Sequence, residues 1–168
     1  MKSFIIALTI LPLATFAQNC KLTKTTDPFT HETKLSTGFI PFDNGNLNLS
    51  ISIDATANDV DFFFWLTSGT NCFDDQSTAQ IIYDGERMKA NFRNNGSMNC
   101  EGAFHLNFRN LATTPSALDR IATKKIKNIH LAGANKTIVD IALTEDQKQK
   151  LMELASCVIK EAKTLIKQ

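Results

Sequence analysis

The histidine residues are the first candidates for acid–base chemistry, because the imidazole ring titrates near neutral pH. The chain of 168 residues contains three of them, His31, His105 and His130. His31 lies in a polar segment, and His105 and His130 alternate with apolar residues, which predicts surface positions for all three. No Ser, Cys or carboxylate stands at a spacing that indicates a catalytic pair with any of them. The sequence therefore names no catalytic residue and favours a function other than catalysis.

Aspartates near predicted strand ends are the candidates for metal binding, because Ca²⁺ prefers oxygen ligands. Asp54, Asp59 and Asp61 surround one predicted turn, and Asp74 and Asp75 follow a cysteine. The chain contains no D-x-[DN]-x-[DN]-G loop, and aspartate is common in turns for conformational reasons alone. We therefore expect no cofactor and no metal, with a weak calcium site as the alternative.

Two further segments have side chains suited to binding. The segment from Asn91 to Asn99 is rich in adaptable polar groups, and we predict that Asn94 and Asn95 form a binding loop together with Asp74 and Asp75. The alternative for this segment is a solvated hairpin loop. The run from Phe62 to Trp65 predicts a central strand that is buried on both faces, with an aromatic binding platform as the alternative.

The start of the chain is typical of a secretory signal. Lys2 precedes an apolar run from Phe4 to Leu13, which is too short to span a bilayer, and Thr15 to Ala17 matches a cleavage site. Removal of residues 1–17 leaves residues 18–168, which we predict to form a single secreted or periplasmic domain. This mature chain contains 17 basic and 17 acidic residues, so a broad positive surface for nucleic acid is not expected.

The four cysteines are an even set, and export makes disulfides the expected state. Asn19 directly before Cys20 is a poor fit to a lipid-modified cysteine, so a lipid anchor is the less favoured alternative. Cys72 and Cys100 flank two neighbouring predicted strands and should pair with each other. The remaining pair, Cys20 and Cys157, would link the start of the mature chain to the last helix.

The predicted elements give an α+β fold, with a largely antiparallel sheet and a long C-terminal helix packed on one of its faces. An opening hairpin is expected from Cys20 to Ser36, followed by an alternating strand near residues 47–54, a strand at 62–66 that is apolar on both faces, a hairpin over 81–93 and an alternating strand near 104–109. Asp84 and Gly85 should form a two-residue turn within the hairpin over 81–93. A short helix should start at Pro115, two strands should follow near residues 126–131 and 137–143, and a capping box at Thr144 and Gln147 should start the long helix.

Several short strings of this chain resemble a group of small secreted proteins common in Bacteroidota. They are the signal ending FAQ, the hairpin string DPFTHETK, the DGE turn, the segment KKIKNIHL after a short helix, and QKLMELASCVIK in the last helix. The resemblance implies the same fold and export, and it adds no catalytic or binding residue. The predicted function is a secreted or periplasmic binding module with a protein or glycan partner and no nucleic acid or membrane span. The alternative is a small hydrolase with a dispersed acidic site.

Overall fold

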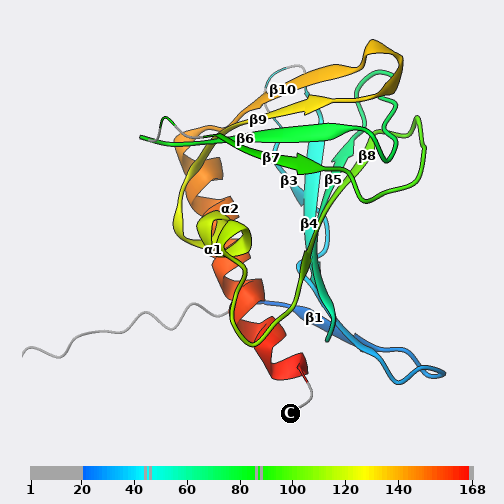
Figure 1. Ribbon diagram of the computed structural model, residues 1–168, viewed down its shortest axis with the longest axis vertical. Coiled ribbons are helices and arrows are strands. Elements are labelled where there is room, and N and C mark those ends of the chain that lie inside the picture. Colours follow the sequence, from blue (N-terminus) through cyan, green and yellow to red (C-terminus); the bar gives the residue numbers. More distant parts are fainter. Residues whose placement is uncertain (1–20, 44, 46, 86, 88, 167–168) are drawn as a thin grey trace, which may run out of the picture.

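The computed structural model describes residues 21–43, 45, 47–85, 87 and 89–166. It shows an α+β fold with antiparallel strands, a short helix and a long C-terminal helix, which confirms the predicted fold class. The strands form two sheets rather than the one expected, and the smaller sheet runs across one end of the larger (Figure 1). The predicted signal segment 1–17 and Cys20 lie outside the described residues.

The larger sheet contains six strands in the order β1-β2-β4-β5-β8, with β3 beside β4. Strands β1 and β2 form the predicted opening hairpin, which projects from the body of the protein (Figure 1). The described strands of this sheet are β1 (Thr23–Thr26), β2 (Thr33–Ser36), β3 (Ile40–Pro41), β4 (Leu49–Ala55), β5 (Asp59–Leu66) and β8 (Ala103–Arg109).

The smaller sheet has four strands in the order β10-β9-β6-β7. A 3-10 turn, η1 (Ala134–Lys136), joins β9 to β10. The strands are β6 (Thr78–Tyr83), β7 (Lys89–Arg93), β9 (Ile126–Ala132) and β10 (Ile138–Ala142).

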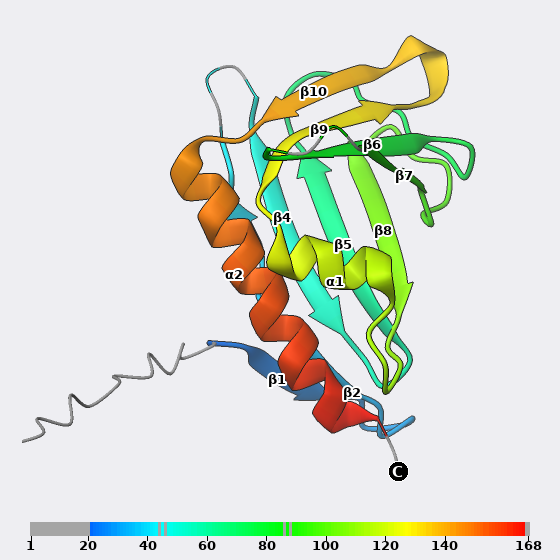
Figure 2. The ribbon, with the colours of Figure 1, turned by 60° about the vertical axis from the view of Figure 1, so that its left-hand side comes forward.

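Two helices lie over the same face of the larger sheet (Figure 2). Helix α1 spans Ser116–Thr123, and helix α2 spans Glu145–Ala162 and continues into the 3-10 turn η2 (Lys163–Leu165). The predicted capping box is present, because the Gln147 backbone N–H donates to Thr144 Oγ1 and the Thr144 backbone N–H donates to Gln147 Oε1. Helix α2 contacts β2 and β4 of the larger sheet and β9 of the smaller one, so it joins the two sheets.

The hydrophobic core contains buried residues of both sheets and both helices, and much of it lies on the inner face of the larger sheet. Alternate residues of each strand point to this face because side chains alternate along a β-strand. On β5 these are Val60, Phe62, Phe64 and Leu66, all of which are buried. Burial of large apolar side chains is the main favourable contribution to folding, so this layer is the principal source of stability.

The predicted two-residue turn at Asp84 and Gly85 is wrong. Ile82 pairs with Lys89, whereas a two-residue turn at Asp84 and Gly85 would place it opposite Arg87. Tyr83 pairs with Ile126 of β9, and the Asp84 backbone N–H donates to the Lys125 carbonyl. The end of β6 is therefore held by β9.

Strand β5 is central in the larger sheet, as predicted, but it is not buried on both faces. Phe62 and Phe64 are buried, whereas Trp65 is 41% exposed and Phe63 is half-buried. Both helices cover the other face of the sheet, which leaves the face containing Phe63 and Trp65 without a helical layer (Figure 2). Within the described part of the chain, no helix combines the length and apolar character needed to cross a membrane.

Candidate functional site

The outer face of the larger sheet, opposite the helices, presents polar and aromatic side chains. Asp61, Phe63 and Trp65 follow one another on this face of β5, about 7 Å apart along the strand. In the strand register, Phe63 lies opposite Ser52 and His105. The outer face is therefore built from neighbouring positions on three strands, β4, β5 and β8.

Three rings form what we call the aromatic cluster, which consists of Phe39, Phe63 and Trp65. The centroid of the Phe39 ring lies 5.2 Å from that of Phe63 and 5.4 Å from that of Trp65. Phe39 is 49% exposed and Trp65 is 41% exposed. The rings are thus positioned by one another while much of their apolar surface remains in contact with solvent.

The connection from β2 to β3 places Phe39 over the sheet. The Thr37 backbone N–H donates to the Ile53 carbonyl at 3.1 Å, and the Ile53 backbone N–H donates to Thr37 Oγ1 at 2.9 Å. Gly38 adopts a φ of 65°, which is in the left-handed region that glycine tolerates best. These two features turn the chain so that Phe39 reaches the rings of β5.

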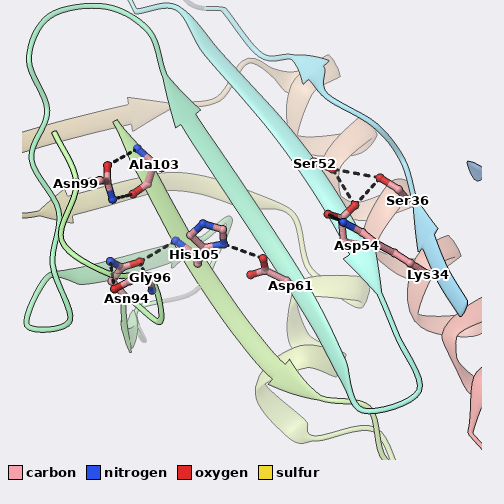
Figure 3. A network of polar contacts seen from close by, with 10 residues as sticks. All are labelled: Lys34, Ser36, Ser52, Asp54, Asp61, Asn94, Gly96, Asn99, Ala103 and His105. Carbon is pink, nitrogen blue, oxygen red and sulfur yellow. Dashed lines mark hydrogen bonds and ion pairs between the residues drawn. The ribbon is translucent and has the colours of Figure 1, made fainter. Parts of the chain in front are cut away.

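His105 extends the aromatic cluster toward the acidic side chains of the outer face. Its ring stacks on Phe63 with centroids 4.3 Å apart and an interplanar angle of 13°. His105 Nδ1 lies 2.8 Å from Asp61 Oδ2, and Figure 3 shows the two side chains pointing toward each other across β5 and β8. His105 therefore lies on the outer face, as its alternation predicted, and its ring is held between a phenyl ring and a carboxylate.

Asp54 and Asp61 lie directly opposite each other on β4 and β5. Like charges in this position repel each other, and each carboxylate has its own compensating partner. Lys34 Nζ lies 2.7 Å from Asp54 Oδ2, while Asp61 is paired with His105. Asp54 is therefore paired with a cation, and Asp61 is held by a hydrogen bond with an imidazole ring.

Ser52 is 3% exposed, although its alternation on β4 predicted a wet position. Its hydroxyl donates to Asp54 Oδ1 at 3.0 Å, and the Ser36 hydroxyl also donates to Asp54 (Figure 3). Because a buried hydroxyl without a partner would be costly, this carboxylate is part of the reason that Ser52 can be buried. Asp54 is therefore used mainly to organise its own sheet.

The predicted binding loop comes together as expected, but its side chains have structural contacts. Asp74 Oδ1 accepts hydrogen bonds from the Ser77 hydroxyl at 2.7 Å and from the Gln76 backbone N–H at 3.1 Å. The hydrogen bond from the Ser77 hydroxyl is the main cause of a pKa of Asp74 below its usual value, and the one from the Gln76 backbone N–H lowers it further. Asp75 is exposed. Asp74 therefore stabilises a turn and is not held ready for a ligand.

Asn94 is also a structural residue, with only 3% of its surface exposed. Its side-chain Nδ2 donates to the Asp74 carbonyl at 2.8 Å, and its Oδ1 accepts from the His105 backbone N–H at 2.8 Å. The prediction of a ligand-binding role for Asn94 is therefore not supported by its contacts. Asn95 is exposed, and its backbone N–H donates to the His105 carbonyl at 3.1 Å.

The Cys72–Cys100 disulfide confirms one predicted pair. Phe73 and Asn99, next to these cysteines, exchange two backbone hydrogen bonds of 2.8 Å, so the two loops lie side by side as predicted. Cys157 is disulfide-bonded, and its predicted partner Cys20 lies outside the described residues. The Cys20 and Cys157 pairing therefore stays a prediction.

The other histidines and the aspartates do not assemble into a second site. His130 Nδ1 lies 2.8 Å from Asp140 Oδ1 on the neighbouring strand β10, and His31 is exposed in the opening hairpin. Among the described residues, no group of three or more His, Cys, Asp or Glu side chains is placed to hold a metal ion.

Comparison of the chain with protein-family models, with curated proteins and with solved structures finds no match.

Sequence reasoning missed two parts of the outer face. Phe39 lies in a short apolar string, FIPF, and its contact with β5 depends on the path of the connection after β2. The pairing of His105 with Asp61 depends on strand register, since the residues are 44 positions apart. The alternating exposure of Phe63 and Trp65 is a signal that could have been found, because both occupy the same face as the charged Asp61.

Proposed function

We propose that the mature chain is a non-enzymatic binding module and that its ligand binds to the aromatic cluster on the outer face of the larger sheet. The observation that supports this proposal is the exposure of Phe39 and Trp65 at neighbouring positions on a face that no helix covers. Exposed aromatic groups that are held in place by their neighbours lose little conformational freedom on binding. They are also the residue types that contribute most strongly at many binding interfaces.

The module acts in secreted or periplasmic form. The Cys72–Cys100 disulfide supports this localisation, because disulfides persist mainly in oxidising compartments. The resemblance to small secreted proteins of Bacteroidota agrees with it. The intact mass of the exported protein should correspond to a chain that begins at Gln18, and peptide mapping under non-reducing conditions should join Cys20 to Cys157. A diacylglyceryl mass on Cys20 would contradict the unanchored form.

A small hydrolase with a dispersed acidic site has weaker support. Hydrogen bonds within the chain occupy the carboxylates of Asp54 and Asp74, as described above. Asp61 is paired with His105. A histidine that acts as a general base beside a carboxylate would still require a positioned nucleophile. The contacts on the outer face therefore fit ligand binding better than catalysis.

The proposal can be tested with matched surface variants of the mature protein. Immobilised wild-type protein, a Phe39→Ala/Trp65→Ala double variant and a Phe29→Ala control would each be incubated with extracts of the native envelope. Phe29 is a suitable control because it is 90% exposed in the turn of the β1–β2 hairpin and is not part of the aromatic cluster. We expect the double variant alone to lose the captured component. Equal capture by all three proteins would show that the aromatic cluster is not the binding site.

A further inference from the structure

We infer that the ligand of the aromatic cluster is a neutral glycan. This inference rests on the proposed function and specifies its ligand. Sugar rings have apolar C–H faces that pack on aromatic rings, and their hydroxyl groups donate hydrogen bonds to carboxylates. The outer face presents both kinds of group on one strand, because Asp61, Phe63 and Trp65 alternate along β5. The described residues also give three independent reasons to favour a glycan over other partners.

The first reason is the size of the apolar surface. An aromatic side chain has a surface of about 150 to 250 Å², so the half-exposed Phe39 and Trp65 each offer about 100 Å². With a smaller contribution from Phe63, the aromatic cluster offers roughly 200 to 300 Å². A stable protein partner buries about 800 Å² on each side. The aromatic cluster therefore matches a few sugar rings better than the core of a protein interface.

The second reason is that the adjacent sheet edge is closed to an added peptide strand. At Ala103 on β8, the backbone N–H donates to Asn99 Oδ1 and the carbonyl accepts from Asn99 Nδ2, at 3.1 and 3.0 Å. At His105 the backbone N–H and carbonyl bond with Asn94 and Asn95. These contacts are drawn in Figure 3 for Asn94 and Asn99. A peptide that binds by strand addition needs these backbone groups, which are already occupied beside the cluster.

The third reason is the charge around the rings. Asp54 and Asp61 are the nearest acidic groups; Lys34 balances the charge of Asp54, and His105 Nδ1 lies within hydrogen-bond distance of Asp61. This arrangement offers no excess positive charge to a polyanion such as an acidic polysaccharide or a nucleic acid. The Asp61 side chain is 25% exposed, but its Oδ1 is buried and accepts no hydrogen bond from the described residues. A sugar hydroxyl group would therefore donate to Asp61 Oδ2, because a carboxylate oxygen has a second lone pair besides the one that faces His105 Nδ1.

The inference can be tested by calorimetry on the mature protein with defined oligosaccharides. The probes are neutral hexasaccharides of glucose, mannose, galactose and N-acetylglucosamine, with oligogalacturonate as the anionic comparison. We expect at least one neutral probe to bind, and Trp65→Ala to weaken that binding roughly tenfold or more, because a large apolar contact is removed. Trp65→Phe should retain most of the affinity, since it keeps a ring at this position. Phe29→Ala should change the affinity by less than about twofold, because ligand contact is not expected there.

The outcomes separate this inference from the proposed function. Failure of every neutral probe to bind, or tighter binding of oligogalacturonate, would overturn the glycan inference. If envelope capture still depends on Phe39 and Trp65 in that case, the outer face remains a binding site for another class of ligand. Binding of a neutral probe that is unchanged in Trp65→Ala would overturn the assignment of the glycan to the aromatic cluster. Circular dichroism of each variant confirms that a loss of binding does not reflect unfolding.

Discussion

Replacement of Asn94 by Ala should destabilise the protein strongly, although this residue occupies a loop that sequence reasoning assigned to ligand binding. The buried Asn94 side chain links two segments that are distant in the sequence. It donates to the Asp74 carbonyl and accepts from the His105 backbone N–H, and it also accepts from the Gly96 backbone N–H at 3.2 Å. Alanine removes all of these bonds; the Asp74 carbonyl keeps the hydrogen bond of 3.2 Å from the Ser77 backbone N–H, whereas the His105 and Gly96 N–H groups lose their acceptor.

The size of the effect follows from the number of polar groups left unpaired. A buried donor or acceptor that loses its partner costs about 1 to 3 kcal/mol. Two such groups, the backbone N–H groups of His105 and Gly96, therefore give a loss of about 2 to 6 kcal/mol in the free energy of unfolding. With a urea dependence of about 2 kcal/mol per M, a loss of about 3 kcal/mol lowers the denaturation midpoint by about 1.5 M.

Urea denaturation followed by circular dichroism measures this effect with the disulfides intact. Asn95→Ala is the matched control, because its side chain is exposed and its backbone N–H contact with His105 is kept. We expect the free energy of unfolding of Asn95→Ala to stay within about 0.5 kcal/mol of the wild-type value. A loss of less than about 1 kcal/mol in Asn94→Ala would show that its hydrogen bonds are not structural, and the original interpretation as an adaptable loop residue would then be preferred.

Two other contacts give further predictions. Lys148 lowers the pKa of Asp84 through a hydrogen bond of 2.9 Å. The pKa of Glu145 is also lowered, mainly by its hydrogen bond with Lys125 and to a smaller extent by the one with Lys148. A carboxylate whose pKa is lowered in the folded state stabilises the protein fully above its unfolded pKa, and this stabilisation is lost as the pH falls through the folded pKa. Lys148→Met should therefore have a smaller free energy of unfolding than wild type above about pH 5, and the difference should shrink toward about pH 2. Denaturation curves measured at several pH values test this. A difference that does not change with pH would contradict this account. The Cys72–Cys100 disulfide closes a loop with a sequence separation of 28. A Cys72→Ser/Cys100→Ser double variant should therefore lose about 3 to 4 kcal/mol of its free energy of unfolding in urea denaturation. An unchanged midpoint would exclude a stabilising role for this bond.

Local patterns predicted the elements of the fold with considerable success. Pro115 preceded the short helix, and Thr144 with Gln147 started the long one, because caps and helix starts depend on neighbouring residues. The pairing of Cys72 with Cys100 followed from their positions at the ends of adjacent strands. These features need little information about distant parts of the chain.

The binding face was harder to predict because it depends on contacts between distant residues. Whether the outer side of β5 is covered depends on where the helices pack, and the place of Asp61 on the same face as Phe63 and Trp65 is a local sign that it is not. Asn94 has the residue type of a solvated loop, and only the approach of β8 makes it a buried link. The division into two sheets has the same origin, since β6 pairs with β9 across more than 40 residues of chain.

The fluorescence of Trp65 provides the most direct test of the claim that the aromatic cluster is the binding site. The chain contains a single tryptophan, so its emission reports on this position alone. Acrylamide quenching would be measured on the mature protein before and after saturation with the component captured from the envelope or with a neutral hexasaccharide that binds in calorimetry. We predict weaker quenching and a shift of the emission to shorter wavelength, because the ligand would cover the exposed indole ring. A ligand that saturates the protein and leaves both quantities unchanged would contradict the account.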